Sequence, residues 1–176
     1  MRVGSSAGTY SIKRRPIPVG AAEARADLVR LYRWWMDRCA PDGRAPVHRH
    51  IDPGLVKRLG LAGKIHIVDV ATDDPANYRF RVFAKRVTLF GGRDFAGSRV
   101  GDLGEEYRNA VTEDYLIAAA SEVPRLHDVD ARWGSNHRSY QRLIVPFASV
   151  RGKADCLLVA VSFGDVVSGH APGSRP

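Results

Sequence analysis

Apolar and polar residues alternate along residues 78–84. Tyr78, Phe80 and Val82 fall on one face of this stretch, and two arginines fall on the other. A period of two residues is the pattern of a half-buried strand. Similar alternation, or a short apolar run between turn residues, predicts four more strands, at residues 65–70, 125–131, 137–147 and 154–163. An Asp-Asp-Pro turn at residues 73–75 predicts that the first two strands pair antiparallel.

A period of three to four residues predicts two longer helices, at residues 21–39 and 105–121. Asp52 and Pro53 are typical of a helix start, because Asp accepts from the free amide groups and Pro fits the first helical position. They predict a short helix that begins at Pro53 and that Gly60 ends. Two further short helical segments are expected at residues 85–90 and 100–103.

These elements together predict an α+β fold built on one five-stranded antiparallel sheet. The connection from the second strand to the third passes through helical segments, so it crosses the sheet. We expect the short helices to cover one face of the sheet and the N-terminal helix to pack as an addition. A sheet of this kind offers a hollow for a ligand and a surface for a second chain.

Composition divides the chain into four segments. Residues 1–20, rich in Gly, Ser, Pro and Arg, are interpreted as a flexible basic arm. A helical extension, the core domain and a disordered tail rich in Gly, Pro and Ser should follow, at residues 21–60, 61–164 and 165–176. The formal charge is +8, and residues 1–60 hold 12 Lys and Arg against 5 Asp and Glu. The basic excess therefore belongs to the N-terminal part of the chain.

Three segments, in this order, resemble the PAS fold. The first joins LYRWW at 31–35 to the Ile-Asp-Pro at 51–53, the second joins YRFRV at 78–82 to LFGGRDFAG at 89–97, and the third is YQRLIVPF at 140–147. The nearer resemblance is to the short stand-alone PAS-like proteins of alphaproteobacteria. It implies that the core at 61–164 is PAS-like. It also implies sensing or protein interaction, often by a dimer, with no reaction catalysed.

The chain departs from this family at two points. Phe83 and Ala84 stand where the family often has Val-Gly before its short helix, and the bulkier pair would reshape a pocket there. The flavin-binding members carry a Cys on that helix, whereas residues 85–90 read KRVTLF. Covalent flavin chemistry is therefore not expected, and we expect no cofactor.

The resemblance places a ligand pocket between the sheet and the short helices. The candidates for lining it are aromatic and aliphatic residues of the central region: Phe80, Val87, Phe90, Leu103, Tyr107, Tyr115, Tyr140 and Ile144. The three tyrosine hydroxyls can orient a small molecule in an otherwise apolar site. The alternative is a filled core, because protein interiors are close-packed.

The N-terminal helix is the candidate interface. Leu28, Leu31, Trp34 and Trp35 are the residues expected to take part. The two adjacent tryptophans point about 100° apart on a helix, so one can fill the core while the other meets a second chain. We expect a homodimer and a signalling protein of unknown identity as partners. The alternative is that both tryptophans are buried within one chain.

The sequence contains no evident catalytic or metal-binding constellation. His48, His50 and Asp52 are spaced like metal ligands, but no further His completes the set and Asp52 is expected to cap a helix. Cys39 and Cys156 are far apart and are typical of a reducing compartment. We therefore predict a protein that is not an enzyme and that resides in the cytoplasm.

Other polar residues have structural interpretations. His66, His127 and His137 are possible axial ligands of haem, but we interpret each of them as a structural histidine. Glu113 and Asp114 are interpreted as part of the solvated face of their helix.

A nucleic-acid-binding module is the alternative function. It would bring basic residues of the N-terminal part against phosphates: Lys13, Arg14, Arg15, Arg25, Arg30, Arg33 and Arg38. Net charge mainly affects solubility and non-specific association, so we expect no dedicated nucleic-acid partner. No apolar run reaches the length of a bilayer span, and no membrane partner is expected.

Overall fold

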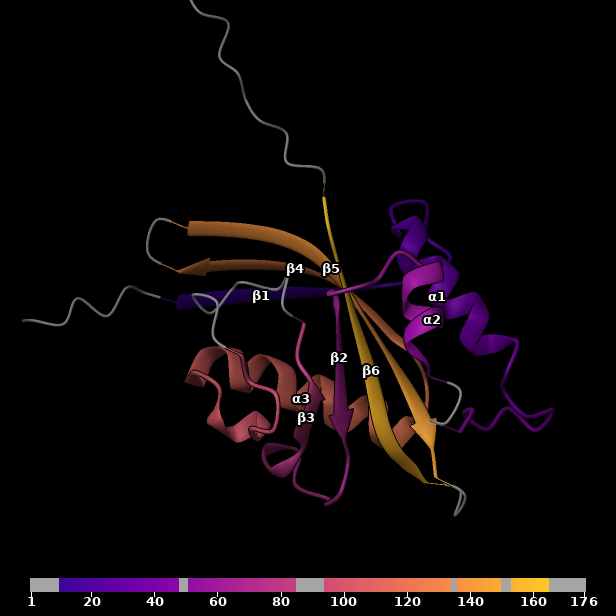
Figure 1. Cartoon of the computed structure of the whole chain (residues 1–176). Coiled ribbons are helices and arrows are strands. Elements are labelled where there is room, and N and C mark those ends of the chain that lie inside the picture. The colour runs from indigo at the N-terminus through magenta and orange to yellow at the C-terminus, as the bar shows by residue number, and fades with distance from the viewer. Residues whose placement is uncertain (1–9, 48–50, 85–93, 134–135, 150–152, 165–176) are drawn as a thin grey trace, which may run out of the picture.

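The computed structural model describes residues 10–47, 51–84, 94–133, 136–149 and 153–164. Figure 1 shows a strongly twisted sheet with helices on both of its faces. Its strands are β1 (Tyr10–Ile17), β2 (Ile65–Asp69), β3 (Arg79–Val82), β4 (Arg125–Trp133), β5 (Asn136–Ala148) and β6 (Ala154–Phe163). They follow the order β1-β4-β5-β6-β2-β3, and every neighbouring pair is antiparallel. The prediction of an antiparallel α+β fold is confirmed.

The helices lie in two layers. They are α1 (Ala26–Met36), α2 (Pro53–Arg58) and α3 (Glu105–Ser121), with two 3₁₀ turns, η2 (Pro75–Asn77) and η4 (Val100–Asp102). We call the face that α3 and η4 cover the inner face, and the face that α1 and α2 cover the outer face (Figure 1). Both faces of the sheet are thus covered, where the sequence predicted helices on one face and an added N-terminal helix.

Strands β5 and β6 lie at the centre of the sheet and supply both cores. Ile144 and Val159 point to the inner face, while their chain neighbours Val145 and Leu158 point to the outer face. All four side chains are buried. This explains why β6 is a continuous apolar run rather than an alternating strand: a strand covered on both sides is apolar on both sides.

The sixth strand, β1, corrects the prediction of five strands. Residues 10–17 were expected within a flexible arm, yet they pair with β4 along their whole length. The consecutive basic residues at 13–15 interrupt the apolar–polar alternation that would otherwise indicate a strand. Two of them are accommodated by acidic partners, since Arg14 pairs with Asp114 and Arg15 with Asp128. With those partners, Ile12 packs on the inner cluster and Ile17 is buried in the outer one.

A bulge in the β2–β3 pair corrects a second prediction. Phe80 lies opposite Val68, but Val82 lies opposite Ile67, so the register shifts by one residue at Arg81. An extra residue in one strand turns the following side chains to the other face. Phe80 is consequently buried in the inner core, whereas Val82 is 39% exposed and does not share its face.

Several predicted elements are confirmed. The helix at 105–121 forms as α3, and α2 begins at Pro53 after Asp52, whose side chain accepts from the Leu55 amide at 2.8 Å. Gly60 follows with φ +74°, a conformation that favours glycine. The first helix is shorter than expected. The helix predicted at 85–90 and the tail at 165–176 lie outside the described residues.

Candidate functional site

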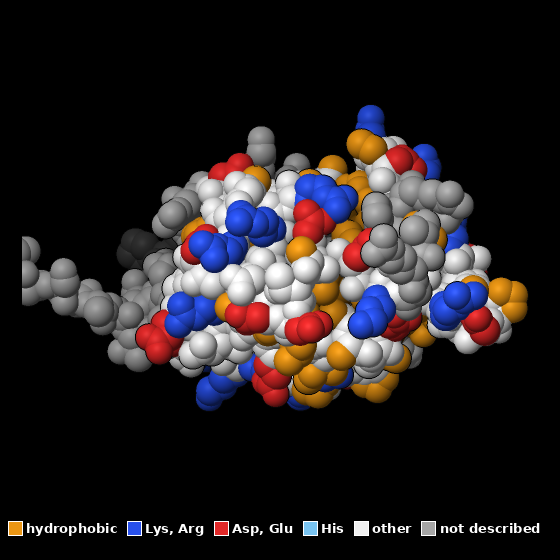
Figure 2. All heavy atoms as spheres, turned by 90° about the horizontal axis from the view of Figure 1, so that it is seen from below, with side chains coloured by type: hydrophobic (Ala, Val, Ile, Leu, Met, Phe, Trp, Pro, Cys, Tyr) orange, Lys and Arg blue, Asp and Glu red, His pale blue; other side chains and the backbone are white. Residues whose placement is uncertain are grey.

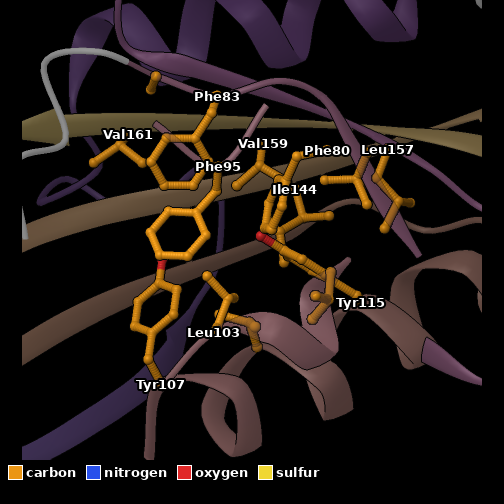
Figure 3. Close-up of a cluster of buried hydrophobic side chains, with 14 of the residues drawn as sticks. Phe80, Phe83, Phe95, Leu103, Tyr107, Tyr115, Ile144, Leu157, Val159 and Val161 are labelled. Carbon is orange, nitrogen blue, oxygen red and sulfur yellow. The ribbon is translucent and has the colours of Figure 1, made fainter. Parts of the chain in front are cut away.

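Six of the eight predicted pocket residues meet on the inner face. Phe80, Leu103, Tyr107, Tyr115, Tyr140 and Ile144 belong to one cluster of buried residues, and each is at most 3% exposed. Figure 3 shows Phe80, Tyr115 and Ile144 pointing toward one another from β3, α3 and β5. Val87 and Phe90 lie outside the described residues. These six residues gather as a buried core, and their role in lining a ligand pocket stays a prediction.

Aromatic rings extend this cluster along the β2–β3 end of the sheet. The Phe83 ring lies 5.2 Å from the Phe80 ring and 5.3 Å from the Phe95 ring, between centroids. His66 from β2 packs on Phe83 at 4.4 Å and accepts a hydrogen bond from the Ala84 amide at its Nδ1. Burial, with a smaller effect from Arg142, lowers the pKa of His66 to about 3. This imidazole is therefore neutral at physiological pH.

A buried ion pair joins α3 to the sheet. Asp114 of α3 accepts a hydrogen bond from the Arg142 guanidinium of β5, and the two residues are 3% and 1% exposed. This corrects the interpretation of Asp114 as part of a solvated helix face. A signal for the pair exists in the sequence, because both charged residues occupy positions of the apolar period of their elements, Asp114 between Ala110 and Ala118. The periodicity does not show, however, that Asp114 and Arg142 are partners.

Two more cationic or titratable groups face the same carboxylate. Arg14 Nε of β1 lies 2.9 Å from Asp114 Oδ2, and His127 Nε2 of β4 lies 3.6 Å from Oδ1. Burial, followed by the positive charge of Arg142, lowers the pKa of His127 to about 4. The imidazole is neutral, so Asp114 is held by two arginines. Asp114 thus connects β1, β4, β5 and α3.

The predicted interface residues lie mainly inside the fold. Leu28, Leu31 and Trp35 are at most 3% exposed and pack on the outer face of the sheet. Trp35 Nε1 donates to the Pro146 carbonyl at 2.6 Å. These three side chains have almost no surface to offer a second chain, which corrects their assignment. Trp34 is half-buried and remains at the surface of α1.

A glutamine that the sequence did not single out fixes the start of α1. Gln141 of β5 is 5% exposed, and its Oε1 accepts from the Arg25 amide at 2.8 Å. Its Nε2 donates to the Glu23 carbonyl at 2.8 Å and to Asp128 Oδ1 at 3.0 Å. Because Gln141 and Arg142 are consecutive, one short stretch of β5 contacts α1 on one face and α3 on the other.

An exposed Asp-His-Ser group at the β4–β5 hairpin resembles a hydrolytic triad in composition. His137 Nε2 lies 2.5 Å from Asp130 Oδ2 and 3.4 Å from Ser139 Oγ. In a triad the carboxylate holds one ring nitrogen and the nucleophile faces the other. Here one nitrogen faces both groups, so this arrangement does not activate the serine. The hydrogen bond from His137 instead lowers the pKa of Asp130.

The remaining candidates for chemistry have structural roles or lie outside the described part. His48 and His50 are among the residues not described, and Asp52 caps α2. Cys156 is fully buried, and burial raises the pKa of its thiol to about 12. Within the described residues, no three His, Cys, Asp or Glu side chains gather as metal ligands would. None of the described helices has both the length and the apolar character that a bilayer span requires.

Comparison with known proteins yields one resemblance. No family model matches the chain, and no curated protein matches it. Among solved structures, the chain is similar to the PAS domain of BvgS from Bordetella pertussis, with 18% identity and a TM-score of 0.45. The alignment covers 65% of this chain and 88% of that domain.

Proposed function

We propose that this chain is a PAS-like sensory or protein-interaction domain that catalyses no reaction. The observation that carries the proposal is the pair Gln141–Arg142 on β5. Gln141 bonds to the start of α1, and Arg142 bonds to α3 on the opposite face. Because these two residues are consecutive in β5, a change in how α3 packs on the sheet can be transmitted through the β5 backbone to the contacts that position α1.

The proposed mechanism is a population shift. A ligand or partner that favours one packing of the inner layer changes the balance between two arrangements of α3, and α1 follows through β5. In an arrangement with a more open inner layer, the inner cluster would supply apolar walls, and Tyr107 and Tyr115 would supply polar tips near the Arg142 charge. This combination suits a small, mainly apolar molecule with one polar group.

Homodimerisation is the proposed output, and α1 is its proposed surface. Trp34 lies on the Phe147 ring at 6.2 Å between centroids, with the Arg38 guanidinium 4.4 Å from the Trp34 ring. Met36, at the end of the same helix, is 47% exposed. A half-buried tryptophan beside an arginine and an exposed apolar side chain is typical of an interface anchor.

Light scattering coupled to size-exclusion chromatography tests the dimer. The wild type should elute as a dimer, and Trp34→Ala should weaken association by at least about tenfold, as expected for an interface anchor. Val123→Ala is the matched control, because Val123 is an exposed apolar residue away from α1. A monomeric wild type, or a dimer equally stable in Trp34→Ala, would contradict the proposed surface.

Native mass spectrometry tests the ligand. The freshly purified chain should carry an additional small mass that denaturing conditions release. Tyr115→Phe removes a hydroxyl from the inner cluster without changing its volume appreciably, and it should reduce the occupied fraction. An unoccupied protein would leave protein–protein association as the function of the domain.

The structure does not favour the nucleic-acid alternative. Arg14 and Arg15 of the predicted basic arm pair with Asp114 and Asp128 of the same chain. On the face that Figure 2 shows, Lys and Arg side chains are interspersed with Asp and Glu. A salt titration with a generic DNA duplex is the test, since phosphate binding weakens steeply as salt rises. Binding with that steep dependence would support the alternative.

A further inference from the structure

A polar hollow lies beside the Asp114 carboxylate, between α3 and the edge of the sheet that β1 and β4 form. Its volume is about 240 Å³. The residues around it come from these three elements: Arg14, Pro16, Glu113, Asp114, Ile117, Arg125 and His127. One water occupies about 30 Å³ in the liquid, so the hollow has room for an anion of several heavy atoms.

Two nitrogen atoms of the residues that line this hollow lack hydrogen-bond partners. Arg125 Nε is buried and has no partner among the described residues, and the same holds for His127 Nδ1. Arg125 and His127 are two residues apart on β4, so they point to the same face of the strand. Burying a guanidinium N–H without an acceptor is unfavourable. Arg125 therefore has a hydrogen-bond donor that no described residue satisfies.

The charges around the hollow leave a positive excess. The carboxylates of Glu113 and Asp114 face three guanidinium groups: Arg14 and Arg125, which line the hollow, and Arg142, which pairs with Asp114 behind it. Arg14 contacts both carboxylates and Arg142 pairs with Asp114, so these two arginines balance the two negative charges. The Arg125 guanidinium is the charge left over, because neither carboxylate of the hollow is paired with it.

We propose that this hollow binds a small oxyanion, a carboxylate or phosphate group, through the Arg125 guanidinium. A planar guanidinium presents N–H donors in a fork that matches two oxygens of either group. Arg14 also lines the hollow, where it offsets the charge of the two carboxylates. This site is separate from the inner aromatic cluster, and the inference goes beyond the proposed sensory function.

The hollow shares two of its residues with the ion-pair network of the interior. Arg14 and Asp114 line the hollow and also take part in the ion-pair network that joins β1, β5 and α3. An oxyanion bound at Arg125 would compete with Asp114 and Glu113 for Arg14. Its binding is thus linked to the packing of β1 against α3.

Isothermal titration calorimetry on the full chain tests the proposal, with inorganic phosphate and acetate as separate probes. Ionic strength is held constant with sodium chloride, because screening alone also changes with added salt. We expect saturable binding of at least one probe. Arg125→Gln should weaken it by about tenfold or more, since hydrogen bonds to charged groups contribute about that factor. Binding of only one probe identifies which oxyanion the hollow takes.

Arg132→Gln is the matched control. Arg132 lies on the same strand, is exposed, and pairs with Asp130 away from the hollow. Its variant should bind the probe as the wild type does. If Arg125→Gln fails to fold, Arg125→Lys serves instead, because it keeps the charge but removes the forked guanidinium donors, and it should also weaken binding.

Two results would overturn the site. One is an absence of saturable heat with either probe in the wild type. The other is binding that Arg125→Gln leaves unchanged, which would place the oxyanion elsewhere. Neither result affects the dimer and native-mass measurements above, so failure of the oxyanion site and failure of the proposed function are distinguishable.

Discussion

Arg142 on β5 and Asp114 on α3 form an ion pair in the interior, with 2% and 4% of their side chains exposed. Removing two charges from water is unfavourable, and their attraction at short range offsets most of that cost. Such a pair adds little net stability, but neither partner can be removed alone without leaving an isolated buried charge. The pair therefore fixes which turn of α3 lies over which residue of β5.

Asp114→Asn should destabilise the fold strongly. The change leaves the Arg142 charge buried without its nearest carboxylate, and we expect the free energy of unfolding to fall by about 3–5 kcal/mol. Urea denaturation followed by circular dichroism measures it. Glu113→Gln is the control, because this neighbouring side chain is 64% exposed and should contribute below about 1 kcal/mol. Equal effects of the two variants would contradict the importance of burial.

Stability should fall as the medium becomes acidic. The pKa values of His66 and His127 are lowered from 6.5 to about 3 and about 4 in the folded chain. Below pH 6.5 the unfolded chain therefore binds protons that the folded chain does not. The free energy of unfolding should decrease from pH 6.5 down to about pH 4 for His127 and about pH 3 for His66.

The slope of this decrease is at most about 1.4 kcal/mol per pH unit for each histidine. Denaturant midpoints measured from pH 7 downward check it. His127→Gln should flatten the dependence, and His137→Gln is the matched control because that imidazole lies at the surface. A stability profile that His127→Gln leaves unchanged would contradict the assignment.

Gln141→Leu should loosen α1 selectively. The apolar side chain keeps the size but leaves the Arg25 amide and the Glu23 carbonyl without these partners. Loss of such partly buried hydrogen bonds costs about 1–3 kcal/mol. Hydrogen exchange should become faster in α1 than in α3. Ser139→Ala, an exposed change on the same strand, should leave exchange in α1 unaltered.

Glu122→Gly should stabilise the chain. Glu122 follows α3 with φ +54°, the left-handed conformation that favours glycine at the end of a helix. Relief of this strain, less the entropy that glycine loses on folding, should raise the free energy of unfolding by up to about 1 kcal/mol. Ala120→Gly is the control of opposite sign, because glycine within the helix destabilises by about 1 kcal/mol. Thermal unfolding of both variants measures the difference.

The membership of the inner cluster was predicted in part from sequence, while its role as a ligand pocket stays a prediction. Tyr107, Tyr115, Tyr140 and Ile144 gather as expected, because each lies on the apolar face of its own element. Arg142 and Asp114 were not recognised as partners, since 28 residues separate them and no local pattern states which charges will meet. Gln141 was missed for the same reason: its three hydrogen bonds reach a segment near α1 and a residue on β4.

The sequence by itself determined the elements whose cause is local. The period of α3, the Asp52 cap and the apolar stretches of the central strands follow from neighbouring side chains, and they form where expected. Only the tertiary structure decided that β1 joins the sheet, that a bulge at Arg81 turns Val82 outward, and that α1 covers the outer face. Strand register and charge pairing depend on which distant segments pack together. Those contacts are selected by how much apolar surface the complete fold buries, which no local stretch of sequence specifies.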